Sequence, residues 1–205
     1  MDSIKLFINQ SIIILILIVS IAVLTLVTFI LPVELANYEK DLYLLVIKTI
    51  SFLFVFKMIL KINFLHLISN DKFNRIDALK ILLLAVTYSV LFNYYVVNFT
   101  IGENMLMNKH SIIKSIELFF VAPLLEEILF RGIIQKRFNQ ELNYFLSIML
   151  TSILFSLYHA TYQYLFSHLA FSMVVGLIYH KYNSLLLCVF FHSLINIGIF
   201  TIYSL

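Results

Sequence analysis

Long apolar stretches separated by short polar connections make up most of the chain. Seven of them approach the length needed to cross roughly 30 Å of hydrocarbon at about 1.5 Å per residue. They lie near residues 8–31, 42–60, 81–102, 114–136, 143–162, 165–180 and 183–204. The second contains Lys48 and the sixth is short, so six to eight spans fit the same pattern. The pattern predicts an all-α, polytopic transmembrane helical bundle of about seven spans.

The first apolar stretch is predicted to be a membrane helix, not a signal peptide. The uncharged run from Leu6 to Val33 has 28 residues, whereas the apolar region of a signal peptide has about 7–15 and ends at small residues. No such cleavage site follows the run. We therefore count it as the first span.

Basic residues predict how the bundle is oriented. With seven spans, ten Lys and Arg residues fall on one side and three on the other, while Lys48 fits neither side. The side richer in Lys and Arg is expected to face the cytoplasm. We therefore expect a multi-pass cell-membrane protein with its N-terminus in the cytoplasm and its C-terminus outside.

Composition narrows the class of protein further. The chain is 62% hydrophobic and 12% charged, whereas soluble domains carry roughly 25% charged residues. This argues against a soluble globular protein and makes the lipid bilayer its expected solvent. The single Cys188 excludes a disulfide framework. The net charge of +3 is small and its basic residues are dispersed, so we expect no nucleic-acid partner.

Polar side chains inside the predicted spans carry the functional information. A charged side chain at mid-membrane costs at least about 2.5–3.5 kcal/mol, so those that remain are candidate site residues. Together with one aromatic neighbour they are Glu126, Glu127, Arg131, Phe155, His159, His192 and Asn196.

Helical spacing sorts these residues into faces. Glu127 and Arg131 are four apart and can pair, whereas Glu126 points about 100° away, towards an expected polar cavity. His192 and Asn196 also share a face and can present two polar groups towards one point between helices. The spacing therefore predicts one neutralised acid and one acid available for chemistry.

Structural roles remain open for several of these residues. The acid–arginine pair fits a structural ion pair near a helix end. His159, His192 and Asn196, each taken alone, fit hydrogen bonds between helices. His168 and His180 match no pattern and are interpreted as ordinary polar contacts. Pro123 is predicted to kink its helix, freeing backbone groups and opening a cavity.

The three groups together carry a resemblance to a known family. Glu126-Glu127 with Arg131, Phe155 with His159, and His192 with Asn196 resemble the EExxxR, FxxxH and HxxxN motifs of the CPBP family of intramembrane proteases. This family is also called the ABI or CAAX protease and bacteriocin-processing family. The resemblance predicts a catalytic four-helix core at 111–205 after a variable N-terminal part of transmembrane helices at 1–110.

One segment departs from the family pattern. Gly176 fits the small residues expected before the last motif, but the turn that follows reads Tyr182-Asn183-Ser184 instead of a Thr-Gly type. This difference bears on helix packing and the substrate cleft more than on the motif residues.

The resemblance implies a mechanism for peptide hydrolysis. It implies that Glu126 and His159 bind and activate a water molecule while His192 and Asn196 hold the oxyanion. Glu127, Arg131 and Phe155 are then supporting residues. If a divalent metal such as zinc takes part, its ligands would be Glu126, His159 and His192, but they lack the HExxH spacing. We slightly favour a glutamate mechanism without a tightly bound metal.

The predicted function is therefore that of an intramembrane endopeptidase acting on membrane-associated or lipidated peptides. CAAX-type processing, bacteriocin or pheromone maturation and self-immunity are the roles that the family implies. The alternative is a non-catalytic membrane immunity or binding protein that retains the fold. A small transporter is a third reading, but it would favour repeated halves, and the sequence contains no evident repeat.

Depth along the predicted spans presents one difficulty. Counted from the span ends at 136 and 183, Glu126 and His192 lie ~15 Å and ~13 Å deep, but His159 lies ~24 Å from residue 143. These depths allow a shared site only if the helix of His159 is tilted, displaced or begins later than predicted.

Overall fold

The structure is a computed structural model that describes residues 46, 49–50, 74–99, 112–159 and 164–203 of the 205-residue chain. The chain divides into two compact units, Met1–Phe64 and Leu65–Leu205, and every helix discussed below belongs to the second. The predicted span 8–31 and nearly all of 42–60 lie outside the described residues. Within the described ranges all regular secondary structure is helical, so the all-α class is confirmed.

Four long helices occupy predicted apolar stretches. They are α4 (Arg75–Phe99), α8 (Tyr144–Tyr158), α9 (Leu165–Tyr182) and α10 (Leu185–Tyr203). In the part of the chain that the structure describes, no helix combines the length and hydropathy needed to cross a membrane. The number of spans and their orientation therefore stay predictions.

The remaining predicted stretch, 114–136, forms a run of short helical segments instead of one regular α-helix. These are α5 (Ile112–Ile116), η2 (Glu117–Val121), α6 (Ala122–Glu127), η3 (Ile128–Gln135) and α7 (Lys136–Glu141). The η segments are π-helical, with backbone bonds that reach five residues back in place of four. One such bond runs from the Ala122 N–H to Glu117 O.

The helix ends follow from local side-chain chemistry. Asn143 begins α8 because its side chain accepts a hydrogen bond from the Leu146 N–H at 2.9 Å. Asn183 ends α9 in the left-handed conformation, with φ 46° and ψ 37°, and Ser184 Oγ then accepts from the Leu187 N–H at 3.1 Å. Asn tolerates left-handed backbone better than most residues. The departure at Tyr182-Asn183-Ser184 therefore still forms a tight turn between two helices.

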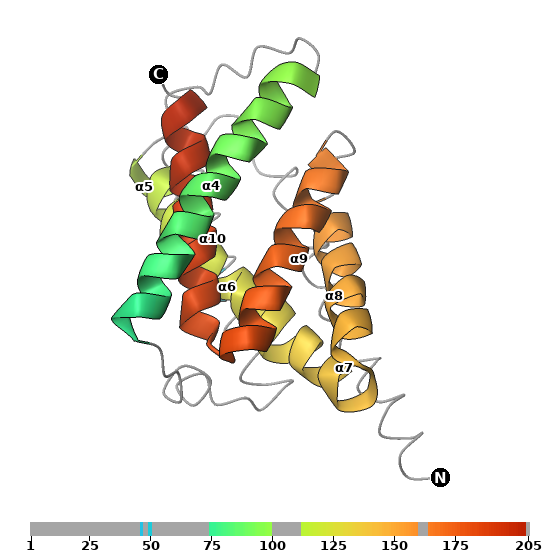
Figure 1. The fold of residues 1–205 in the computed structure, drawn as a ribbon. Helices are drawn as coiled ribbons and strands as arrows, with labels where there is room; N and C mark the ends of the chain where they lie inside the picture. Colours follow the sequence, from blue (N-terminus) through green and yellow to red (C-terminus); the bar gives the residue numbers. More distant parts are fainter. Residues whose placement is uncertain (1–45, 47–48, 51–73, 100–111, 160–163, 204–205) are drawn as a thin grey trace, which may run out of the picture. The chain divides into compact units, whose positions relative to one another are not determined.

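The long helices pack in two side-by-side pairs, α8 with α9 and α4 with α10 (Figure 1). Gly176 allows the first close approach, because a Cβ there would lie 2.9 Å from Ile148 Cγ2. Gly198 allows the second, because a Cβ there would lie 2.7 Å from Ser89 Oγ. Helix α4, which precedes the predicted catalytic core, thus packs directly on α10.

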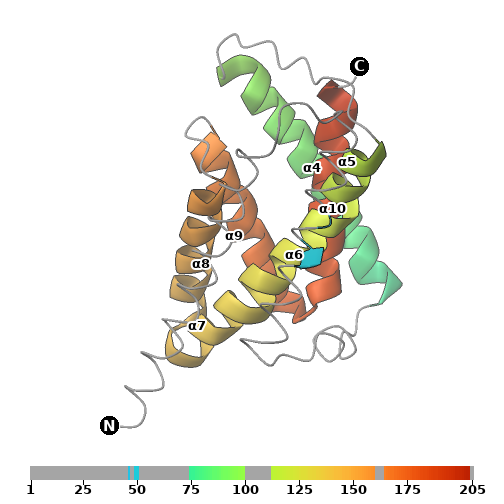
Figure 2. The same ribbon diagram turned by 180° about the vertical axis from the view of Figure 1, so that it is seen from behind.

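The helix of Glu126 extends beyond its predicted end, and this corrects the depth calculation. The prediction stopped at residue 136, but α7 continues to Glu141. Glu126 lies fifteen residues before that end, and His159 lies fifteen residues after Tyr144, where α8 begins. The two residues therefore lie equal numbers of residues from the turn that connects α7 with α8. Seen from behind, the α6–α7 segment runs obliquely from α10 towards the foot of α8 (Figure 2).

Candidate active site

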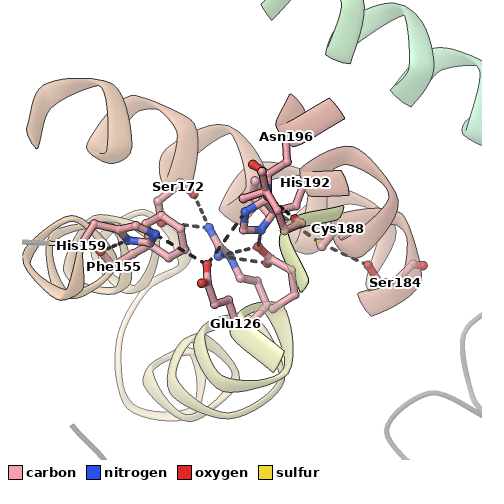
Figure 3. Close-up of polar contacts among 12 residues, drawn as sticks. Glu126, Phe155, His159, Ser172, Ser184, Cys188, His192 and Asn196 are labelled. Atoms are coloured by element: carbon pink, nitrogen blue, oxygen red, sulfur yellow. Dashed lines mark hydrogen bonds and ion pairs between the residues drawn. The ribbon is translucent and has the colours of Figure 1, made fainter. Parts of the chain in front are cut away.

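Two histidines from different helices face one carboxylate oxygen. His159 Nε2 lies 3.7 Å from Glu126 Oε2, and His192 Nε2 lies 3.9 Å from the same atom. Figure 3 shows these side chains converging from α6, the end of α8 and α10. The side chains of Glu126, His159 and His192 are 17%, 25% and 6% exposed. The side chains of Glu126 and His159 are therefore partly exposed, whereas the Glu126 Oε2 atom that faces the histidines is buried.

In each histidine, the Nδ1 atom is hydrogen-bonded to an acceptor oxygen. His159 Nδ1 donates to Phe155 O at 2.9 Å, and His192 Nδ1 donates to Glu127 Oε1 at 2.7 Å. Because a carbonyl or an ionised carboxylate only accepts, Nδ1 carries the proton in both rings. In the neutral rings Nε2 is then unprotonated and faces Glu126 Oε2. Both Nε2 atoms are positioned to accept or return a proton there.

Glu127 joins the predicted ion pair to the second histidine. Arg131 Nη1 donates to Glu127 Oε1 at 3.0 Å and lies 2.9 Å from Oε2. Both side chains are fully buried. The predicted pairing of Glu127 with Arg131 is confirmed, and the same carboxylate also holds His192. Spacing along one helix could not predict this contact, because it joins residues on two helices.

Arg131 ties the buried carboxylate to α8 and α9. Its Nη2 atom donates to Ser172 Oγ at 2.8 Å and to Ser172 O at 3.0 Å. Its guanidinium carbon lies 5.1 Å from the centre of the Phe155 ring, within the range of a cation–π contact. Phe155 is 1% exposed and so is a packing residue. Ser172 was not among the predicted site residues.

Asn196 lies one helical turn after His192, and its amide nitrogen has a backbone partner. Asn196 Nδ2 donates to Leu118 O at 2.8 Å. That carbonyl needs a side-chain donor, because the Ala122 N–H bonds to Glu117 O instead and Pro123 has no N–H. The prediction that Pro123 frees backbone groups is therefore confirmed. In Figure 3, Asn196 lies beyond His192 on the side away from His159.

Two further residues were interpreted from the sequence as ordinary polar contacts. His168 stacks on His159, with ring centres 4.4 Å apart and planes at 20°. His180 stacks on Tyr144 at the opposite end of α9, also at 4.4 Å, with planes at 9°. His168 therefore adjoins the candidate site, whereas His180 does not.

The comparison with protein families shows what the segment that carries this cluster is similar to. Residues 108–198 match the family model described as type II CAAX prenyl endopeptidase Rce1-like. The segment is an Rce1-like family domain. No curated protein and no solved structure matches the chain. The resemblance to the CPBP family carried by the three motifs is thus confirmed.

The Rce1-like domain contains every residue of the cluster, from Glu126 to Asn196. Proteins of this family are membrane proteins, and the family implies peptidase activity and prenylated protein substrates.

Zinc coordination was the second interpretation of Glu126, His159 and His192. Among the described residues, no three or more His, Cys, Asp and Glu side chains are grouped so that they could hold a metal ion.

Proposed function

We propose that this protein is an intramembrane endopeptidase that cleaves membrane-associated or lipidated peptides with a water molecule activated by Glu126 and His159. The observation that carries the proposal is the convergence of two histidine Nε2 atoms on Glu126 Oε2, at 3.7 and 3.9 Å. These separations are too long for direct hydrogen bonds. In the proposed site, one water molecule about 2.8 Å from each of Glu126 Oε2 and His159 Nε2 would bridge the two atoms.

Glu126 is the proposed general base. It takes a proton from the water as the water oxygen bonds to the carbonyl carbon of the scissile peptide. The carbonyl electrons move onto its oxygen, giving a tetrahedral intermediate. When that intermediate collapses, the C–N bond breaks and the leaving amine takes the proton from Glu126. His159 Nε2 accepts a hydrogen bond from the same water and holds it in line.

His192 is the proposed donor to the oxyanion. Its Nδ1–H is bound to the buried Glu127 carboxylate, so its Nε2 must also carry a proton in order to donate. Glu127 supports this doubly protonated ring, as the buried carboxylate does in a serine protease triad. Arg131 holds the Glu127 carboxylate in place. Removing one oxyanion donor typically costs about 2.7–4 kcal/mol of transition-state stabilisation.

Asn196 is proposed to serve both the fold and the reaction. Its amide nitrogen carries two hydrogens, and one of them binds Leu118 O. The second is then available for the oxyanion beside His192. Its backbone bond fixes the direction of the amide, so the donor needs no reorganisation when charge develops.

The proposed substrates follow from the family and the predicted membrane location. Prenylated proteins are the class that the family implies. Other lipidated or membrane-inserted peptides, including bacteriocin and pheromone precursors, present the same chemistry: a peptide bond held at the bilayer by an apolar anchor. Self-immunity would follow if the cleaved peptide were a toxin made by the same cell.

The test is cleavage of a mixed library of prenylated, acylated and unmodified membrane peptides by the purified chain in nanodiscs, followed by mass spectrometry. Glu126→Gln should lose at least about 10²–10⁴-fold in rate, because it removes the base. Glu141→Gln is the matched control: Glu141 is an exposed glutamate paired with Arg137 at the end of α7, and the variant should cleave normally. A chelator should have no effect on a glutamate mechanism.

Two results would count against the proposal. If the wild-type chain and Glu126→Gln are equally silent across the library, the non-catalytic immunity or binding function replaces the enzyme. If cleavage persists in Glu126→Gln, another group is the base.

A further inference from the structure

His168 is one of the histidines that the three motifs leave unexplained, and its ring lies directly against the proposed site. Its ring stacks on that of His159 at 4.4 Å between centres. Tyr164 meets the His168 ring edge-on, at 6.5 Å and 89°. Helix α9 thus contributes a ring to the cluster as well as the Ser172 contact to Arg131.

His159 needs such a neighbour because of where it lies. It is the residue that ends α8, so no further helical turn follows it in that element. Its Nδ1 bond to Phe155 O fixes one atom of the ring but leaves the ring free to turn about that bond. The direction of Nε2 depends on the plane of the ring. A stacked partner fixes that plane.

The other rings around His159 cannot fix the plane of its imidazole relative to the rest of the site. Phe155 and Tyr158 contact it at 4.4 and 5.3 Å, but both belong to α8 and move with it. His168 belongs to α9, one turn before Ser172, which binds Arg131. The stack therefore connects His159 to the same helix that holds the buried ion pair.

We propose that His168 is a positioning residue whose stacked ring holds the plane of His159 so that Nε2 faces Glu126 Oε2. Its effect on rate rests on the proposed function, but its effect on the His159 ring does not. An aromatic ring is what the position requires. Phenylalanine should therefore replace His168, whereas alanine and asparagine should not.

The direct test is the tautomer of His159 in the full chain, labelled with 15N-histidine and reconstituted in nanodiscs. Nitrogen shifts separate protonated from unprotonated ring nitrogens, and the His159 signals are identified by their loss in His159→Gln. Wild type and His168→Phe should carry the proton on Nδ1. In His168→Ala the unsupported ring should turn far enough to break its Nδ1–H bond to Phe155 O in part of the molecules, so that an Nε2–H form appears as well.

Cleavage of a library peptide is the second readout. His168→Ala should lower kcat by about tenfold to a hundredfold, the loss expected when a reacting group is displaced by about 1 Å. KM should change little, because substrate binding is not what the stack supports. His168→Phe should retain most of the wild-type rate. The matched control is His180→Ala, which removes a stacked histidine from the far end of the same helix and should alter neither readout.

Several outcomes would overturn the inference. One is a His168→Ala protein with the wild-type tautomer and rate. Another is a folded His168→Phe protein that behaves like the alanine variant, which also decides the matter if His168→Ala does not fold. If His168→Asn retained function while His168→Phe and His168→Ala lost it, the role of His168 would be hydrogen bonding instead of stacking. If wild type cleaves no peptide, the proposed function fails, while the tautomer comparison still decides the role of His168.

Discussion

Replacing Glu127 by Gln tests the buried centre of the site. The change keeps the shape of the side chain but removes the charge that faces Arg131 at 2.9 Å. Both side chains are 0% exposed, so the guanidinium is left without its counter-ion and without access to water. Breaking a buried pair in this way typically costs about 3–5 kcal/mol. For a chain of this length that corresponds to a fall of about 6–20 °C in Tm, at roughly 2–4 °C per kcal/mol.

The fold itself provides the control for this prediction. Arg137 and Glu141 form another arginine–glutamate pair four residues apart, at 3.1 Å, but their side chains are 20% and 47% exposed. Exposed pairs contribute about 0–1 kcal/mol, so Glu141→Gln should be nearly neutral. Because separation and spacing are similar, the difference between the two variants measures the effect of burial together with that of the His192 bond to Glu127.

The assay is reversible unfolding of the full chain in mixed micelles, followed by far-ultraviolet circular dichroism because the chain has no Trp. Arg131→Met should destabilise as strongly as Glu127→Gln. The double variant should cost less than the sum of the two single variants by about 2 kcal/mol, within the range measured for residues in contact. Additive costs, or a loss in Glu127→Gln no larger than in Glu141→Gln, would refute the reasoning.

Three further predictions concern backbone positions around the site, and the same unfolding assay measures each. Gly176→Ala should lower the free energy of unfolding by about 1–3 kcal/mol through overpacking, because its new methyl group would lie 2.9 Å from an α8 side chain. An unchanged unfolding midpoint would contradict the close packing of α8 on α9. Asn183→Val should lower the free energy of unfolding by roughly 1–2 kcal/mol, because the backbone there is left-handed. Asn183→Gly should be tolerated. Equal unfolding midpoints for the two variants would contradict this prediction. Asn196→Leu should lower the free energy of unfolding by about 1–3 kcal/mol, because it leaves Leu118 O without its donor. Adding Pro123→Ala restores a backbone N–H and should recover part of that loss. No recovery would count against the explanation.

The helices were predictable because apolar runs mark them directly, but their polar ends were not, among them the start of α4 and the end of α7. Hydropathy detects where a segment stops being apolar, and the stretch Lys136–Glu141 is polar. The backbone nevertheless continues as helix through it, since nothing in those six residues breaks a helix. The predicted end at 136 therefore made His159 look too distant from Glu126.

Residue spacing predicted contacts within one helix but not contacts between helices, and the convergence of Glu126, His159 and His192 was implied only by the family resemblance. The four-residue spacing of Glu127 and Arg131 gave the buried pair. The bond from His192 to Glu127 depends on the heights and rotations at which α6 and α10 meet. The spacing of residues within either segment does not determine these heights and rotations. The stack of His168 on His159 was missed for the same reason, since it depends on how α9 lies against the end of α8.

The π-helical segment explains why the buried polar residues form one line. In a regular α-helix, residues four apart drift around the axis by about 40° at each step, given about 100° per residue. Bonds that reach five residues back require more residues per turn and reduce that drift. Glu127, Arg131 and Gln135 are all 0% exposed along η3 and its first flank. A strict α-helical period would have turned the third of them away.

Helix α9 meets this line with residues that are also four apart. Ser172 binds Arg131, and Gly176 O accepts from Gln135 Nε2 at 3.0 Å. His168 lies one step earlier on the same face and reaches His159. Two successive steps along α9 therefore meet two successive steps along η3, and the third meets His159 at the end of α8, where the proposed catalytic residues lie. A substitution that shifts the register anywhere along it, even at Gly176, should displace the histidine that faces Glu126.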